Sequence, residues 1–398
     1  MELESTGPDL EVPTYSLTGD LLSYLKCGLQ YRYANKGSLP PSKPVQLWFG
    51  EFIHAVLEEA YLRWREDDVV GDFPWDWERD IRPIEVEVAK RLSARGLHPN
   101  PNVFSRDDNV EPRPIASRRT EAAINTWGRH LFPLISDAEV ELRGIREIES
   151  SASARADYYE VTGIVDVLGS VELEAADPDN RLIEYLLENE ECRTLIQGEA
   201  GDQYEIIVDY KGTERPPTDS DAWEHYRWQV LTYSWLRSLQ VDASRTVAGM
   251  IIFVNELEHS ESSFESLADA VDRQATDIMP RGEDAERIRQ WRNDPDLGVP
   301  DLSDRLKERR SIRLITISPD ELAPSLDRFD ETVEDIESSV ARETKGEGVI
   351  EPWRERPRGE GAFTAPERRT CTACDFKHYC PIVREADDVD VGGAPSAP

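Results

Sequence analysis

Hydrophobic residues recur every three or four positions in several stretches of this chain, which is the spacing of a helix with one buried face. The clearest stretch is 46–64, whose apolar positions are 49, 53, 56, 57, 60 and 64. The same pattern predicts helices over residues 18–33, 117–134, 223–239 and 319–341. Thr18 is a residue type favoured at an N-cap, so we expect the first helix to begin there.

Shorter runs with alternating or β-branched residues predict strands. They cover residues 138–148, 158–169, 204–210, 246–255 and 311–318. Because a predicted helix falls between the third and fourth of them, strands and helices alternate along the chain. This order predicts an α/β fold in which helices flank a mixed central sheet.

Polar stretches interrupt this pattern. Residues 66–114 are rich in Pro, Asp and Asn and are expected to form a helical and loop insertion. Residues 170–203 hold ten acids against two arginines, and residues 257–310 are rich in Asp, Glu and Arg. Both are interpreted as solvated acidic insertions. Residues 1–13 and the tail 385–398 have the composition of disordered segments.

The remaining segments give the expected domain organisation. Residues 14–65 would hold the N-terminal helices. Residues 115–342 would form the α/β core with its two acidic insertions, and residues 343–384 a C-terminal segment that contains three cysteines.

Charge adds information about the environment of the protein. The net charge is −34, from 80 acids against 46 bases, and lysine is scarce. The acids are spread over every segment, which favours a surface adapted to high salt, as in a halophile. An acidic protein that binds basic partners would instead concentrate its acids in one block. No apolar run approaches a membrane span and no signal peptide is visible, so we expect a cytoplasmic protein.

The cysteines are distributed unevenly. Cys27 stands near the start, and Cys371, Cys374 and Cys380 form a C-x2-C-x5-C motif near the end. Four thiolates can hold a tetrahedral zinc ion or an iron–sulfur cluster, and the spacing alone does not decide between them. The distant fourth cysteine favours the cluster. Alternatively, Cys27 is a small buried hydrophobic residue and the trio is incomplete. Cys192 is expected to be a free thiol.

Two acids fall at the ends of predicted neighbouring strands. Asp166 ends a G-x-x-D motif that begins at Gly163, and Asp209 begins a D-x-K motif that ends at Lys211. Alternation places Asp209 and Lys211 on one face of the sheet. Two carboxylates there can bind Mg²⁺ or Mn²⁺, and the lysine can orient or deprotonate a water, as phosphodiester hydrolysis requires. Each motif alone also occurs by chance or as a strand end.

Other motifs strengthen this interpretation. Gly50 and His54 form G-x-x-x-H on the helix 46–64, where the imidazole could meet a metal. Gln229 and Tyr233 lie at positions i and i+4 of one predicted helix, where ordinary packing is the alternative explanation. An acid on the first strand completes the set. Glu139 and Glu141 share a face by alternation, so the pattern leaves both possible.

Taken in order, these motifs resemble the RecB-like branch of the PD-(D/E)XK nucleases, over residues 17–383. The similarity is greatest to its iron–sulfur members, which are the CRISPR-associated RecB-like exonucleases and the AddB-type nuclease domains. Residues 21–33 look like their first cluster segment, with Gly28 where a proline is usual. Cys380 and Pro381 match their ending. The chain length and the long acidic insertion before Asp209 depart from compact members and leave the subfamily open.

This resemblance implies a restriction-endonuclease-like core whose C-terminal segment is clasped to the N-terminal helix by a structural 4Fe-4S cluster. The implied cluster ligands are Cys27, Cys371, Cys374 and Cys380. The implied ligands of Mg²⁺ or Mn²⁺ are His54, Asp166, Asp209 and the backbone carbonyl of Tyr210. Lys211 would be catalytic, and Gln229 and Tyr233 would support it.

The expected function is therefore that of a metal-dependent DNA nuclease, a single-strand exonuclease in DNA repair, recombination or CRISPR adaptation. No P-loop motif is present, so a separate helicase or CRISPR adaptation proteins would supply DNA single strands or ends. The alternative is an iron–sulfur DNA-binding subunit of a larger helicase–nuclease or adaptation complex, with secondary nuclease activity. A four-cysteine zinc protein of unrelated fold is a third possibility.

Overall fold

The computed structural model describes residues 12–36, 45–66, 72–99, 113–147, 155–174, 177–197, 203–353, 371, 374–378 and 380. These residues belong to two compact units. Unit 1 comprises 1–42, 143–162 and 326–398, and unit 2 comprises 43–142 and 163–325. In the described part of the chain, no helix has both the length and the apolar character needed to cross a membrane.

Unit 2 is built on a mixed sheet. Strand β3 (Tyr158–Glu172) pairs antiparallel with β4 (Gln203–Lys211), β4 pairs parallel with β5 (Thr246–Phe253), and β5 pairs antiparallel with β6 (Ile312–Thr316). Strand β2 (Ile135–Glu147) also pairs with β3. Every residue of β5 is buried, as expected of a strand with neighbours on both sides and helices on both faces. The predicted mixed sheet is confirmed.

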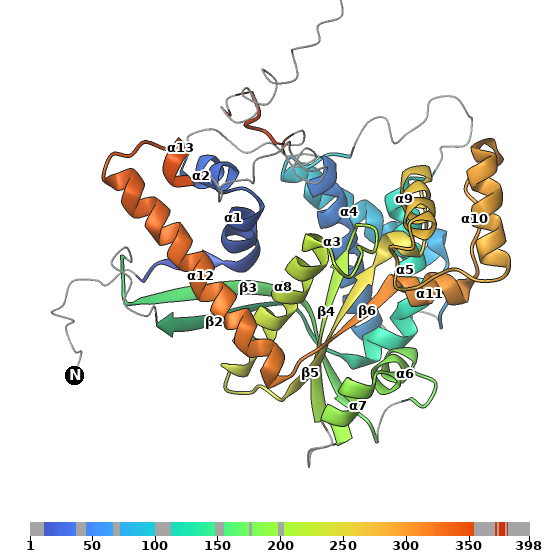
Figure 1. Cartoon of the computed structure of the whole chain (residues 1–398). Helices are drawn as coiled ribbons and strands as arrows, with labels where there is room; N and C mark the ends of the chain where they lie inside the picture. The colour runs from blue at the N-terminus through green and yellow to red at the C-terminus, as the bar shows by residue number, and fades with distance from the viewer. Residues whose placement is uncertain are drawn as a thin grey trace, which may run out of the picture. The chain divides into compact units, whose positions relative to one another are not determined.

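Helices cover both faces of this sheet (Figure 1). On one face, α8 (Asp221–Ser238) approaches β5 so closely that a Cβ at Gly249 would overlap Val230. On the other face, Met250 and Ile252 join a core formed with α3 (Val45–Glu66), α4 (Arg82–Ala94) and α5 (Ile115–Leu131). A 3-10 turn, η4 (Phe132–Leu134), links α5 to β2.

The predicted helices and strands of the α/β core are confirmed to within about three residues at each end. Within the polar excursion 66–114, the described residues 72–99 include a helix, as expected. A π-helical turn, η2 (Trp77–Ile81), leads into α4, and Ile84, Val88 and Leu92 of α4 are fully or almost fully buried. This segment therefore contributes to the core.

The interpretation of 170–203 as a solvated insertion is wrong for its described residues. Strand β3 extends to Glu172, and two short helices follow, α6 (Arg181–Glu188) and α7 (Glu190–Gln197). Leu182, Leu186 and Ile196 are buried in the core of unit 2. Acids on the outer faces of amphipathic helices dominate the composition and hide the apolar period.

The interpretation of 257–310 as a solvated insertion is also wrong. This segment forms α9 (Glu261–Asp272), α10 (Glu283–Asn293), η6 (Pro295–Leu297) and α11 (Asp304–Ser311). The helices lie together beside the sheet of unit 2 (Figure 1). They have a small hydrophobic core of their own, formed by Phe264, Leu267, Ala268, Ile288, Trp291, Leu302 and Leu306.

Unit 1 contains a short strand that the sequence pattern did not predict. Strand β1 (Thr14–Ser16) pairs in parallel with residues 160–162 of β3. Residues 12 and 13 of the expected disordered segment are described, and the Pro13 carbonyl accepts a hydrogen bond from the Glu160 N–H at 2.9 Å. Residues 1–11 and the tail 385–398 lie outside the described residues.

The predicted helix 18–33 is interrupted, and Thr18 is not its N-cap. A π-helical turn, η1 (Leu17–Leu21), is followed by α1 (Leu22–Lys26) and α2 (Gly28–Lys36). The N-cap position is Ser16, whose Oγ donates to the Asp20 carboxylate at 2.8 Å. Cys27 separates α1 from α2 in an extended conformation, with φ −167° and ψ 111°. Spacing alone could not indicate this break, because apolar residues continue through it.

Unit 1 also contains α13 (Ile350–Trp353) and most of the long helix α12 (Pro319–Thr344). The Trp353 ring lies against Tyr24 and Tyr31, with centroids 6.4 and 5.9 Å away. The buried Glu337 of α12 accepts two hydrogen bonds of 2.8 Å from Arg155. Aromatic packing and an ion pair between the half-exposed Arg155 and the buried Glu337 therefore connect parts of unit 1 that are distant in sequence.

Candidate active site

The D-x-K motif lies at the end of β4, beside the fully buried β5. Asp209 pairs in register with Ile251, and Lys211 with Phe253. Both side chains project from the same face, where Lys211 Nζ lies 2.5 Å from Asp209 Oδ2. Lys211 Nζ also donates to Gln229 Oε1 at 3.0 Å. The lysine therefore has a defined position between the strand and α8.

Helix α8 contributes the Q-x-x-x-Y motif to the same place. The Gln229 Nε2 group donates to Asp209 Oδ1 at 3.2 Å and to Tyr233 Oη at 3.0 Å. The Tyr233 ring packs over Gly163, where an added Cβ would lie 2.6 Å from the ring. The glycine of the G-x-x-D motif is thus required for space, because any side chain would displace the tyrosine.

Asp166 and His54 meet beside these groups. The backbone N–H of Tyr210 donates to Asp166 Oδ2 at 2.9 Å, and His54 Nδ1 lies 3.3 Å from the same oxygen. Asp166 comes from β3 and His54 from α3. Glu58, one helical turn after His54, lines the same pocket, as do Tyr61 and Tyr210.

Glu139 completes a candidate metal-binding trio. The ligand atoms of His54, Glu139 and Asp166 all lie within 4.8 Å of one another, and no other group of three potential ligands in the described part of the chain does so. Glu139 has a φ of 51°, in the left-handed region, which redirects its side chain relative to regular strand alternation. Of the two acids left open by the sequence, the geometry thus favours Glu139 over Glu141.

The acidic and basic groups of this site shift one another's pKa values. Burial, Asp166 and Glu58 raise the pKa of Glu139 to about 7. Burial opposes protonation of His54, but Asp166 outweighs it and raises the His54 pKa to about 9. Burial raises the pKa of Asp209 to about 6, although Lys211 acts against this rise. Acids held this close favour a cation between them.

The geometry and the predicted ligand set overlap in part. His54 and Asp166 belong to the trio, whereas Asp209 lies outside it and contacts Lys211 and Gln229. The Tyr210 carbonyl as a ligand stays a prediction. Two carboxylates and one imidazole form a donor set that Mg²⁺ and Mn²⁺ accept, so these residues fit the implied ion.

One contact of Lys211 was missed by the sequence reasoning. Its Nζ lies 5.0 Å from the centroid of the Tyr226 ring, and the Tyr226 hydroxyl is 3.1 Å from Thr213 Oγ1. Tyr226, Gln229 and Tyr233 follow helical spacing along one face of α8. This spacing could have identified Tyr226 from the sequence. Tyrosine is, however, common on buried helix faces that have no catalytic role.

The four predicted ligand cysteines lie around one pocket in unit 1. Cys27, Cys371, Cys374 and Cys380 line it together with five other residues, namely Leu29, Gln30, Tyr33, Phe376 and Lys377. Backbone hydrogen bonds run from Cys374 N to Cys371 O and from Cys380 N to Phe376 O. The four thiols therefore line one pocket, and a cluster bound by them stays a prediction.

None of the five cysteines, all of which the structure describes, forms a disulfide. The four sulfurs around the pocket do not form a group of three within 4.8 Å. Cys192 does not line this pocket. It is buried on α7, with its Sγ 3.8 Å from Thr316 Oγ1.

Three comparisons relate this chain to known proteins. A family model described as the PD-(D/E)XK nuclease superfamily matches residues 19–185 and 195–381. A search of curated proteins found no match. The solved structure titled "Crystal structure of SSO0001" aligns over 89% of this chain and 95% of its own, with 10% identity and a TM-score of 0.25. That alignment does not bear on activity. Since the family model covers most of its length, the chain belongs to the PD-(D/E)XK nuclease superfamily.

Proposed function

We propose that the chain is a metal-dependent DNA nuclease of the RecB-like iron–sulfur branch, and that it degrades single-stranded DNA from an end in repair, recombination or CRISPR adaptation. The observation that carries this proposal is the contact of Lys211 with both Asp209 and Gln229, next to the trio of His54, Glu139 and Asp166. A partly buried lysine that contacts one carboxylate and lies next to two more is suited to charge chemistry at a phosphodiester.

The metal site of this proposal uses His54, Glu139 and Asp166, with the buried Asp209 beside it in contact with Lys211 and Gln229. When bound, Mg²⁺ or Mn²⁺ supplies Lewis acidity toward the phosphate and lowers the pKa of a bound water. The Tyr210 N–H and the His54 imidazole hold the Asp166 carboxylate in one orientation. The site is therefore organised before substrate arrives.

Lys211 is the group that acts on the substrate in this mechanism. Asp209 and Asp166 raise its pKa against the effect of burial, so the ammonium is charged in the absence of substrate. Gln229 and the Tyr226 ring direct Nζ, which can then donate a hydrogen bond to the scissile phosphate or to the attacking water. Tyr233 holds Gln229 in turn through its hydroxyl.

The cysteine pocket of unit 1 would hold a 4Fe-4S cluster with a structural role. This part of the proposal is supported by the lining of one pocket by all four cysteines. Cys27, at the break between α1 and α2, would then tie the N-terminal helices to the C-terminal turns.

Digestion of end-labelled DNA tests the nuclease proposal. Anaerobically purified protein is incubated in molar KCl with Mg²⁺ or Mn²⁺ and single-stranded DNA, duplex DNA or RNA labelled at either end. We expect metal-dependent loss of single-stranded DNA from one end. Asp209→Ala and Lys211→Ala should lower the rate by at least about 10²-fold while the protein still binds DNA.

Asp242→Ala is the matched control, because this exposed carboxylate lies beyond the far end of α8 and pairs with Arg237. It should cleave like the wild type. Full activity of Asp209→Ala would contradict the proposed site. Tight DNA binding by the wild type without cleavage would favour the DNA-binding subunit instead.

A further inference from the structure

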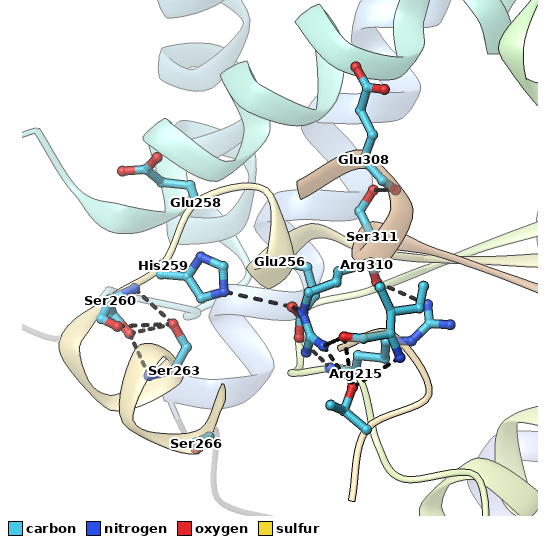
Figure 2. Close-up of polar contacts among 12 residues, drawn as sticks. Arg215, Glu256, Glu258, His259, Ser260, Ser263, Ser266, Glu308, Arg310 and Ser311 are labelled. Atoms are coloured by element: carbon cyan, nitrogen blue, oxygen red, sulfur yellow. Dashed lines mark hydrogen bonds and ion pairs between the residues drawn. The ribbon is translucent and has the colours of Figure 1, made fainter. Parts of the chain in front are cut away.

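A buried carboxylate outside the candidate site lies at the turn that follows β5. Glu256 ends the 3-10 turn η5 (Val254–Glu256) and is 2% exposed. Its Oε1 accepts a hydrogen bond from the backbone N–H of Arg215 at 2.9 Å. Its Oε2 accepts one from Arg310 Nε at 2.6 Å, and His259 Nε2 lies 3.7 Å away (Figure 2).

Glu256 is charged in spite of its burial. Burial disfavours the carboxylate, but Arg310 and His259 outweigh it and hold the Glu256 pKa below the ordinary range. Buried ion pairs contribute little net stability compared with apolar residues of similar size. Their retention therefore suggests a role in holding one specific arrangement of the chain.

The arrangement concerned is the segment that follows Lys211. The Arg215 guanidinium donates to the carbonyls of Ile312 and Arg310, at 2.6 and 3.0 Å, and to Asp277 Oδ1 at 2.8 Å. Figure 2 shows Arg215, Glu256 and Arg310 in one compact cluster. Both the backbone and the side chain of Arg215 are thus held at the ends of β5 and β6.

The first residue of the same segment is held as well. The neighbour of Glu256, Asn255, donates from Nδ2 to the Gly212 carbonyl at 3.2 Å. On its other side Gly212 approaches α3, where an added Cβ would lie 2.9 Å from the Phe49 ring. The segment 212–215 therefore lies between η5 and the helix that carries His54.

This segment also begins the connection between the two catalytic elements. It starts directly after Lys211 on β4 and leads to α8, which carries Gln229. A shift of the segment would change the position of the lysine relative to the glutamine. A misplacement of about 1 Å can lower a catalytic rate by about 10²-fold.

We propose that Glu256 is a positioning residue of the nuclease site. Through the Arg215 backbone and Arg310 it fixes the connection between β4 and α8, and thereby the contact between Lys211 and Gln229. This inference rests on the proposed nuclease function.

The chain offers a matched control for this role. Glu205, at the other end of β4, forms an equally buried ion pair with Arg237, with hydrogen bonds of 2.8 and 2.7 Å. It also accepts from a backbone N–H, that of Ser244. Glu256→Gln and Glu205→Gln thus remove the same kind of charge from opposite ends of the parallel pair β4 and β5.

The test compares the kinetics, melting temperature and amide hydrogen exchange of these two variants. Glu256→Gln should lower kcat by about 10- to 100-fold with KM within about threefold, because the chemical step and not DNA binding depends on the lysine position. Glu205→Gln should lower the melting temperature at least as much but keep kcat within about threefold. Exchange of the Arg215 amide should accelerate by about tenfold in Glu256→Gln only.

Arg310→Lys provides a second route if Glu256→Gln does not fold, because it keeps the charge balance and loses the guanidinium geometry. It should show a smaller kcat loss of the same kind. Wild-type kcat in Glu256→Gln or Arg310→Lys, or an equal loss in Glu205→Gln, would overturn the proposal. Amide exchange is measured without DNA and does not depend on cleavage. If the wild type cleaves no DNA but Arg215 exchange is still faster in Glu256→Gln, the nuclease function is rejected. The role of Glu256 in holding the connection between β4 and α8 would then still stand.

Discussion

Glu139 is the residue whose backbone differs most from its surroundings in the candidate site. A left-handed φ of 51° in a glutamate costs about 1–3 kcal/mol, so the neighbouring structure must hold it. In return, the carboxylate reaches His54 and Asp166 instead of following regular alternation along β2. Backbone strain of this kind concentrates at functional sites, which supports Glu139 as a metal ligand.

Exchange of each acid for its amide tests this assignment. Glu139→Gln should raise the Mn²⁺ or Mg²⁺ concentration for half-maximal cleavage by about tenfold or more, because a neutral amide is a weaker ligand than a carboxylate. Glu141→Gln, two positions along the same strand, should stay within about twofold of the wild type. Metal titration of the cleavage rate gives both values. A larger effect at Glu141 would remove Glu139 from the site.

At this scale the sequence motifs named the residues that the structure brings together, namely His54, Asp166, Asp209, Lys211, Gln229 and Tyr233. Motif spacing could identify them because all of them lie within regular helices and strands, where sequence spacing determines which side chains share a face. It could not decide between Glu139 and Glu141, since a positive φ leaves no trace in an alternating pattern. Nor could it identify Glu256, whose role depends on a turn that contacts another loop.

Among the elements, the turn η5 carries a buried carboxylate, that of Glu256. A group whose folded pKa is depressed contributes stability above its unfolded pKa, about 4.3 for glutamate, and loses it as the pH falls toward the folded value. Glu256 belongs to this class. Its contribution should therefore be complete at neutral pH and decline in acid.

We expect this decline to appear as a difference between two proteins. The melting temperature of the wild type should exceed that of Glu256→Gln by a constant amount from pH 8 to about 5.5, and the gap should narrow from there to about pH 3. Other acids titrate in both proteins and cancel in the comparison. A gap that widens in acid would mean that Glu256 is not ionised in the folded state.

The helices of the two acidic stretches show where composition misleads. Apart from the buried Asp284, the acids in α6, α7 and α10 occupy outer faces, while Leu182, Leu186 and Trp291 are buried. A halophile-like surface raises the number of acids without changing the number of core positions. The hydrophobic period is then a better guide to these helices than their net charge.

The cysteine pocket gives a prediction at the level of a local motif. Anaerobically purified protein should absorb broadly in the visible range and contain about four irons per chain. Cys27→Ser and Cys374→Ser should both lose the iron, because each sulfur lines the same pocket. Cys192→Ser should keep it, since this thiol is buried on α7 away from the pocket lining. Stoichiometric zinc without iron would refute the cluster.

For the whole molecule, a net charge of −34 implies repulsion that salt must screen. The Debye length falls from about 30 Å at 0.01 M to about 3 Å at 1 M, so most of this repulsion disappears in concentrated KCl. Many of the arginines pair with acids at the surface, but the excess of carboxylates remains.

Salt should stabilise the fold by screening repulsion and should weaken DNA binding by reducing counterion release. Measuring melting temperature and DNA affinity on one KCl series separates these two effects. We expect the melting temperature to rise into the molar range, whereas a typical DNA-binding protein loses affinity over the same range. Nuclease activity should follow stability if short-range contacts and metal dominate DNA binding. A flat or falling melting temperature would mean that the acids do not reflect adaptation to salt.

The position of Cys27 also has a consequence for how the protein is made. About 340 residues separate it from Cys371, which lines the same pocket. At about 5–20 residues per second, a ribosome needs roughly 20–70 s to travel between them. The whole of unit 2 is synthesised during this interval. Binding of the proposed cluster by all four thiolates would therefore be one of the last events of biosynthesis, and it would act as a checkpoint on chains whose nuclease core is already complete.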